Sequence, residues 1–190
     1  MPPCHANCDP RRGKNLNMNI LHLLRHAKSS TKTGIEDHER PLSRRGREAA
    51  RRVGRNLSET RGTFDVVLCS SARRTCETLD LVLTEFSSRP RCMIEDGLYL
   101  AGREQLIERL RRLDTRDASV LLIGHNPGLH ELALALADEC SPDFGELASG
   151  KFPTAAYAGF DVTADWPALG YSRYRLIGYV TPKSLSAGHH

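Results

Sequence analysis

Residues 21–30 of the chain read LHLLRHAKSS, an apolar run that ends abruptly in Arg25 and His26 and continues in small and polar residues. Such a short apolar run is typical of a buried strand. The strand would deliver Arg25 and His26 to the carboxyl edge of a sheet, where open α/β folds bind their ligands. Arg25 is a permanent cation, and His26 could be a nucleophile, an acid, a base or a metal ligand. A solvated arginine beside a structural histidine is the plain alternative.

Size and composition favour one soluble domain. Of 190 residues, 39% are hydrophobic and 26% are charged. No apolar run approaches the roughly 20 residues that span a bilayer, so we expect no membrane segment. The formal net charge of +4 comes from 27 basic and 23 acidic residues and implies only a mild preference for anionic ligands. No apolar secretory segment precedes the six scattered cysteines, which predicts a reduced, cytoplasmic protein.

The pattern along the chain predicts a domain between two tails. Residues 1–18 are rich in Pro, Asn, Arg and Gly without apolar periodicity, and we expect a disordered tail there. Within this tail, Cys4 and Cys8 could form half of a zinc site, but no second ligand pair follows at a matching spacing, so we expect no metal. Residues 19–181 are predicted to form the domain, and residues 182–190 a loose tail.

Strands and helices alternate within the domain. We expect strands at 20–24, 64–69, 92–94, 118–123, 155–162 and 171–180. We expect helices at 43–59, over a segment that runs through Leu79 and ends near Phe86, at 103–113 and at 129–136, and a long loop at 140–153. Such alternation predicts a mostly parallel sheet. The helix at 43–59 carries six arginines, but no aromatic residues or recognition motif accompany them, so we expect a solvated face and no nucleic acid. A protein-docking face remains open.

Three predicted strands end in polar residues: Arg25 with His26, Arg73 with Arg74, and His125. The carboxyl ends of parallel strands meet at one edge of a sheet, so two imidazoles and at least two guanidiniums gather there. Forked guanidinium donors suit phosphate. A neutral imidazole can attack phosphorus while guanidiniums neutralise the phosphoryl oxygens, provided that its other ring nitrogen keeps the proton, for which we expect a backbone carbonyl partner.

Four stretches together resemble a known family. They are Leu-Leu-Arg25-His26-Ala-Lys-Ser-Ser, residues 37–46 (DHERPLSRRG), residues 70–78 (SSARRTCET) and residues 124–128 (GHNPG). The chain resembles the histidine phosphatase superfamily, and within it the small SixA-like phosphohistidine phosphatases. The resemblance implies an α/β fold: a three-layer α/β/α sandwich, phosphoglycerate mutase-like, with no cap domain and no cofactor.

The resemblance also implies the roles of four site residues. By the motif positions, His26 is the nucleophile, Arg25 and Arg74 bind phosphate, and His125 completes the pocket as a donor to the phosphoryl oxygens. The motif spacing selects Arg74 over Arg73. The implied enzyme is a metal-independent phosphatase.

Departures from the wider superfamily narrow the expected substrate. Acid phosphatases of the superfamily have His-Asp where this chain has His125-Asn126, and the glutamate acid of the mutases is absent. An alkoxide leaves poorly without an acid, whereas phosphohistidine needs one less. The best remaining acid candidate is Asp37, for which a structural role pairing with Arg40 is equally open. Lys28 either adds charge at the rim of the site or is solvated.

These observations favour a monomeric signal-transduction enzyme that hydrolyses phosphohistidine in proteins through a covalent intermediate. A domain without a cap predicts a shallow, open site, which suits a protein surface. A phosphotransfer domain or a phosphocarrier is the implied partner. Two alternatives stay open: a small-molecule phosphomonoesterase with Asp37 as the acid, and a non-catalytic phosphate-binding module.

Overall fold

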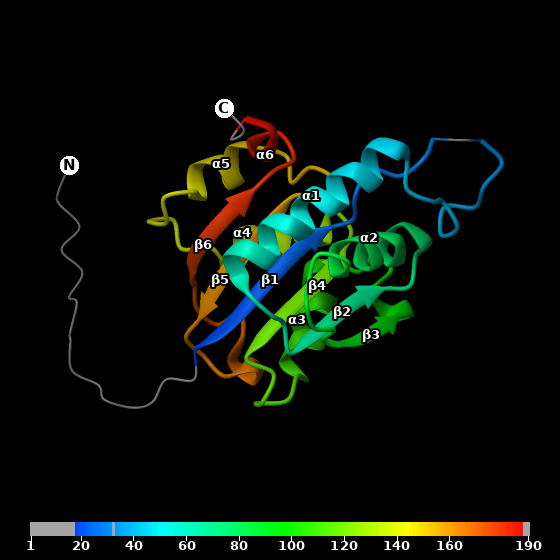
Figure 1. Cartoon of the computed structure of the whole chain (residues 1–190). Coiled ribbons are helices and arrows are strands. Elements are labelled where there is room, and N and C mark those ends of the chain that lie inside the picture. Colours follow the sequence, from blue (N-terminus) through cyan, green and yellow to red (C-terminus); the bar gives the residue numbers. More distant parts are fainter. Residues whose placement is uncertain (1–17, 32, 188–190) are drawn as a thin grey trace, which may run out of the picture.

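The computed structural model describes residues 18–31 and 33–187, so the predicted tail before Met18, with Cys4 and Cys8, lies outside the described residues. Within these residues a six-stranded sheet forms the centre of the fold (Figure 1). Its strands are β1 (Asn19–Arg25), β2 (Val66–Ser70), β3 (Arg91–Glu95), β4 (Ser119–Gly124), β5 (Tyr157–Val162) and β6 (Arg175–Val180). Their order is β3-β2-β4-β1-β5-β6, in which β1 to β4 are parallel and β5 is antiparallel to both neighbours. The predicted, mostly parallel sheet is confirmed.

Helices cover both faces of this sheet and complete a three-layer α/β/α sandwich (Figure 1). One face carries α1 (Arg44–Arg61) and α2 (Arg73–Leu83), and the other carries α3 (Arg103–Arg111) and α4 (Gly128–Leu136). The shorter helices are α5 (Phe144–Ser149), α6 (Ser184–Ala187) and the 3-10 turns η1 (Asp96–Leu98) and η2 (Trp166–Ala168). In the described part of the chain, no helix combines the length and the apolar character that a membrane span requires.

The alternation of side chains along the strands divides the interior into two cores. In β4, Leu121 and Ile123 belong to the core under α1 and α2, whereas Val120 and Leu122 belong to the core under α3 and α4. All four side chains are fully buried. Because a central parallel strand has protein on both faces, it reads as a continuous apolar run, which is why this strand was recognisable from sequence.

Four segments differ from expectation. The predicted loop at 140–153 contains α5, whose six residues are too short for a helical period to stand out. The late strands begin further along the chain than predicted, at Tyr157 and Arg175. Residues 182–187, expected to belong to a loose tail, contain α6, and Arg52 of α1 donates a hydrogen bond to Ser186 Oγ in it.

The turn that follows β1 rests on the first turn of α1. Ser43 is the predicted N-cap, and its Oγ accepts from Gly46 N at 3.1 Å while donating to Lys28 O at 3.0 Å. Ser43 N donates to the same Lys28 oxygen at 2.8 Å. Gly46 lies so close that a Cβ there would be 2.1 Å from Lys28 O. The helix therefore fixes the backbone just after His26.

We expect Gly46→Ala to lower the free energy of unfolding by about 1–3 kcal/mol, because the added methyl group forces backbone apart at a close contact. The phosphatase activity that the sequence resemblance implies should fall too, since the contact lies two residues from His26. Chemical denaturation and an assay with an aryl phosphate measure the two effects. The matched control is Gly145→Ala in α5, where a Cβ meets no atom within 4 Å. Equal behaviour of the two variants would contradict the proposed contact.

Candidate active site

His26 lies just beyond β1 with its ring held in one orientation. The side chain is 7% exposed, and its Nδ1 is 2.8 Å from the carbonyl oxygen of Ala27. A carbonyl can only accept, so Nδ1 carries the proton and donates it, and Nε2 keeps its lone pair. This is the backbone partner that the sequence led us to expect. The turn is fixed from a second side, because Ala27 N donates to Thr78 Oγ1 of α2 at 3.0 Å.

The surroundings keep His26 neutral. The pKa of His26 is lowered to about 4, mainly by burial and further by the positive charges of Arg74, Arg25 and Arg40, against the opposing effect of the Ala27 hydrogen bond. At neutral pH the imidazole is therefore unprotonated at Nε2. An imidazole in this state has the lone pair that a nucleophile needs.

Two buried or half-buried guanidiniums converge beside this ring. Arg25, at the end of β1, donates from Nη1 to Phe152 O at 2.8 Å. Arg74, in the first turn of α2, is 4% exposed, and its Nη2 lies 2.9 Å from Asp37 Oδ2. Burial lowers the pKa of Arg25, and so does the charge of Arg74. Of the two neighbouring arginines of α2, Arg74 lines the cavity beside His26, whereas Arg73 is half exposed and pairs with Glu77.

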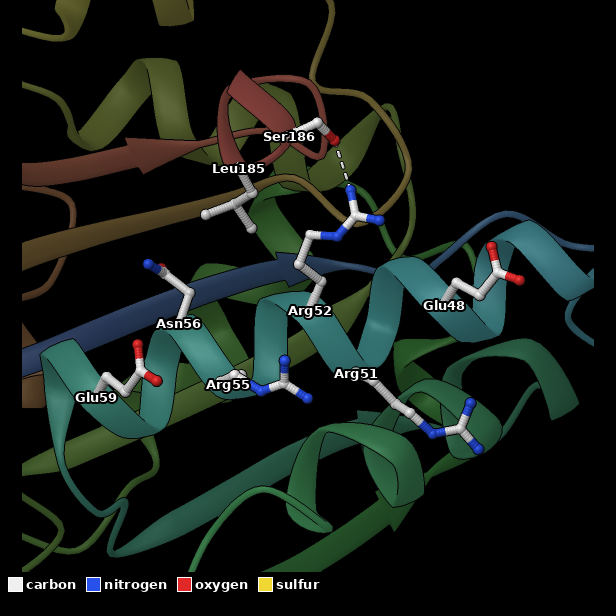
Figure 2. A pocket seen from close by; sticks show the side chains of 8 residues that line it. All are labelled: Glu48, Arg51, Arg52, Arg55, Asn56, Glu59, Leu185 and Ser186. Atoms are coloured by element: carbon white, nitrogen blue, oxygen red, sulfur yellow. Dashed lines mark hydrogen bonds between the residues drawn. The ribbon is translucent and has the colours of Figure 1, made fainter. Parts of the chain in front are cut away.

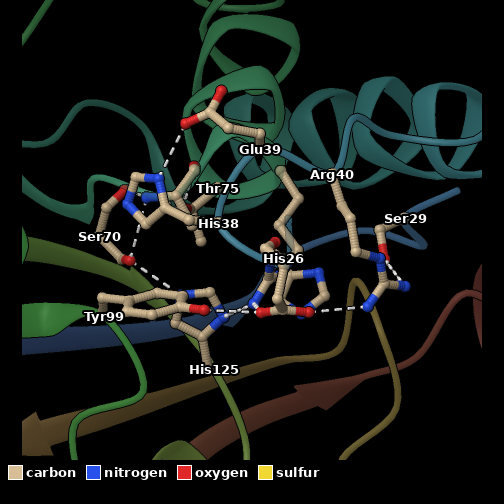
Figure 3. Close-up of polar contacts among 12 residues, drawn as sticks. His26, Ser29, His38, Glu39, Arg40, Ser70, Thr75, Tyr99 and His125 are labelled. Atoms are coloured by element: carbon tan, nitrogen blue, oxygen red, sulfur yellow. Dashed lines mark hydrogen bonds and ion pairs between the residues drawn. The ribbon is translucent and has the colours of Figure 1, made fainter. Parts of the chain in front are cut away.

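His125 follows β4 and faces His26, with 5.2 Å between the ring centroids (Figure 3). Its Nε2 lies 2.8 Å from Ser70 Oγ, and its Nδ1 lies 3.4 Å from Arg74 Nη2. Arginine can only donate, so Nδ1 accepts and Nε2 carries the proton toward Ser70. The pKa of His125 is lowered to about 3, mainly by burial and then by His26 and Arg74, against the opposing charge of Asp37. Both imidazoles are neutral at pH 7.

Asp37 is held by three donors. Tyr99 Oη donates to Oδ2 at 2.7 Å, Arg40 Nη1 donates to Oδ1 at 2.9 Å, and Arg74 donates to Oδ2 (Figure 3 labels Tyr99 and Arg40). The Tyr99 hydrogen bond is the largest cause that lowers the pKa of Asp37 to about 2, with Arg40 and Arg74 adding to it against partial burial. The carboxylate is therefore ionised at neutral pH, and the pairing with Arg40 that the sequence left open is present.

All six candidate residues from the sequence line one open cavity of about 510 Å³. They are Arg25, His26, Lys28, Asp37, Arg74 and His125. Lys28 is exposed at the rim. Asp37 supplies the only carboxylate of the lining described here, against the cations of Arg25, Lys28, Arg40 and Arg74. Such a surplus of positive charge suits a dianion such as a phosphoryl group.

Sequence reasoning gave no role to Ser70, Tyr99 or Phe152. Ser70 holds His125, Tyr99 holds Asp37, and the Phe152 carbonyl holds Arg25. Ser70 was part of a motif, which was the available signal. Tyr99 and Phe152 come from loops that carry no motif. Across the described residues, no cluster of three or more His, Cys, Asp or Glu side chains is arranged to hold a metal.

Comparison with known proteins places this chain in a family. The family model of the histidine phosphatase superfamily (branch 1) matches residues 21–98. The uncharacterized protein Rv1276c of Mycobacterium tuberculosis is 33% identical over 162 residues, which are 84% of this chain and 100% of that protein. An uncharacterized chloroplastic protein of Arabidopsis thaliana, At3g52155, is 34% identical over 62% of this chain and 58% of its own. The chain belongs to the histidine phosphatase superfamily.

Solved structures indicate which group within the superfamily this chain resembles. The putative phosphohistidine phosphatase SixA of Nakamurella multipartitia has a TM-score of 0.76 and 27% identity, over 86% of this chain and 96% of that one. The putative SixA of Agrobacterium tumefaciens has a TM-score of 0.72 and 26% identity, over 86% and 99%. The protein histidine phosphatase SixA with tungstate shares the fold at a TM-score of 0.70 and 22% identity, over 87% and 99%. The protein is SixA-like and has their phosphoglycerate mutase-like fold.

We predict that His26 does not titrate between pH 8 and about pH 5, and that it takes up a proton with a midpoint near 4. Burial and the neighbouring arginines oppose the charged ring. Imidazole carbon chemical shifts followed by NMR measure this midpoint, and the His26→Gln variant assigns the signal. A midpoint near 6.5, the ordinary value, would contradict the site geometry.

The same shift affects stability. Between pH 6.5 and about pH 4 the unfolded chain binds a proton at this position that the folded chain does not. The contribution of His26 to the free energy of unfolding therefore falls as the pH is lowered through that window.

Proposed function

We propose that the protein is a phosphatase that hydrolyses phosphohistidine in proteins through a phosphorylated His26. One observation carries this proposal: among the described residues that line the cavity, the only carboxyl group is Asp37, and three donors keep it ionised. An alkoxide leaving group needs a proton donor, which an ionised carboxylate is not. The imidazole of phosphohistidine can take a proton from solvent as it leaves.

The first step transfers the phosphoryl group to the enzyme. Nε2 of His26 attacks phosphorus, the P–N bond of the substrate breaks, and the departing ring nitrogen receives the electron pair and a solvent proton. Arg25 and Arg74 neutralise the phosphoryl oxygens, which is the main task of a protein in phosphoryl transfer. The hydrogen bond from Nδ1 to Ala27 O stabilises the positive charge that His26 gains.

The second step regenerates His26. Water attacks phosphorus, the bond to Nε2 breaks, and the electron pair returns to the ring nitrogen. Both hydrogens of the water leave with the product as dihydrogen phosphate. The imidazole is again neutral with its proton on Nδ1, so the cycle needs no metal and no nucleotide.

The breadth of the cavity supports a protein substrate. Its mouth is open, with Lys28 and Leu100 exposed at its edge. Sites for small molecules usually enclose their ligand, whereas a phosphohistidine on a protein surface needs to enter only with its ring and phosphate. The putative phosphohistidine phosphatases among the similar structures agree with this choice. A phosphotransfer domain or a phosphocarrier protein is the partner of this chemistry.

His26→Ala should abolish phosphate release from a histidine-phosphorylated protein above the uncatalysed rate, because the attacking nitrogen is lost. The wild type, quenched during turnover with radiolabelled substrate, should carry acid-labile label on His26. His130→Gln on α4 is the control, since a glutamine amide can still donate to Leu147 O. Turnover that survives in His26→Ala would refute the covalent route, and absence of turnover in the wild type would favour a binding module.

Asp37→Asn tests the alternative of a phosphomonoesterase. If Asp37 only positions Arg40 and Arg74, rates on a phosphohistidine peptide and on sugar phosphates should fall by similar factors, about tenfold or less. A general acid would cost about 10²–10⁴-fold on the sugar phosphates alone. Steady-state kinetics of both substrate classes decide between these roles. A wild type that strongly prefers sugar phosphates would reverse the assignment.

A further inference from the structure

A second concave surface adjoins the candidate active site. It is a groove of about 790 Å³ between α1, the loop that precedes β5 and the segment around α6. Lys28 and Thr154 line both the groove and the active-site cavity. A chain lying in the groove would therefore reach the site at its Lys28 rim.

The groove is predominantly basic. Its charged lining contains two carboxylates, Glu48 and Glu146, and five cations: Lys28, Arg45, Arg52, Lys151 and Lys183. All five cations are exposed. Arg52 is engaged with Ser186 Oγ (Figure 2), whereas the other four form no ion pair with any described residue. Elsewhere on the surface of α1, Arg44, Arg47 and Arg55 are paired with glutamates. Four cations without an ion pair to a described residue therefore line the groove beside the active site.

The walls of the groove also offer apolar contact. Ala49, Pro153, Pro182 and the ring of Tyr179 contribute to its lining. Tyr179 is 8% exposed, so the groove presents no open aromatic face on which a nucleic-acid base could stack. Glu48 and Glu146 interrupt the cations of the lining, so that a polypeptide whose acidic side chains are spaced apart avoids them more easily than a continuous phosphate backbone. A polypeptide with acidic side chains and small apolar contacts fits this lining better than a nucleic acid.

We propose that this groove, lined by Arg45, Lys151 and Lys183, docks an acidic segment of the phosphorylated protein while its phosphohistidine occupies the cavity at His26. The inference rests on the proposed function and adds to it the charge of the partner. Complementary charge steers association and affects the rate of encounter more than the chemical step. The groove therefore acts on kcat/KM for proteins, and small phosphoramidates do not sense it.

The test compares two synthetic phosphohistidine peptides that are identical except for their flanks, one with aspartates and one with asparagines. The wild type should have a kcat/KM on the order of tenfold higher for the acidic peptide, and salt should reduce this preference. Lys151→Glu combined with Lys183→Glu should remove it. The double variant should hydrolyse phosphoimidazole within about twofold of the wild-type rate, which also shows that it is folded.

The matched control is Arg89→Glu, which makes the same kind of charge reversal on an exposed arginine before β3, at the opposite edge of the parallel sheet. This variant should keep the preference. A wild type that hydrolyses both peptides equally, or a double variant that still prefers the acidic one, would overturn the docking groove and leave the proposed function intact. A wild type that hydrolyses neither peptide would overturn both. The groove would be reassigned to nucleic acid if the wild type bound a single-stranded DNA oligonucleotide and the double variant did not, while both had the same kcat/KM for each peptide.

Discussion

The hydrogen bond from His26 Nδ1 to the carbonyl oxygen of Ala27 is the interaction on which the site depends. It decides which ring nitrogen keeps the lone pair. Because the bond joins neighbouring residues, its direction depends on a rigid backbone at this turn. That rigidity comes from two helices on the same face of the sheet. Thr78 of α2 binds Ala27 N, and Ser43 at the start of α1 binds Lys28 O. The scaffold of the fold and the chemistry of the site therefore meet in three consecutive residues.

The cavity carries a surplus of positive charge that an anionic ligand would balance. Arg25 and Arg74 oppose protonation of both buried imidazoles, and Arg40 adds to this effect at His26. Asp37 offsets part of this field and aims Arg40 and Arg74. A dianionic phosphoryl group would supply the missing negative charge where the guanidiniums converge. The same arrangement thus keeps His26 uncharged and suits the phosphoryl group that His26 attacks in the proposed reaction.

Much of the architecture is readable from sequence because it depends on local pattern. The apolar run of β4, the N-cap at Ser43 and the motif spacing that selects Arg74 are each encoded in neighbouring residues. The meeting of strand ends at one edge follows from a parallel sheet. The partners of Asp37 and Arg25 were not readable, because Tyr99 and Phe152 reach them from loops whose course is set by tertiary packing. Helix α5 was missed because six residues show too little periodicity.

The bond between Ser70 and His125 has a consequence for how the pocket responds to its contents. A hydroxyl both donates and accepts, so Ser70 Oγ can serve either tautomer of His125 while every heavy atom stays in place. In the structure, Nδ1 accepts from Arg74. If the proton moves to Nδ1, Ser70 turns its hydrogen toward Nε2 and the ring offers a donor to an oxyanion. One serine thus lets a neutral histidine change its polarity without a conformational change.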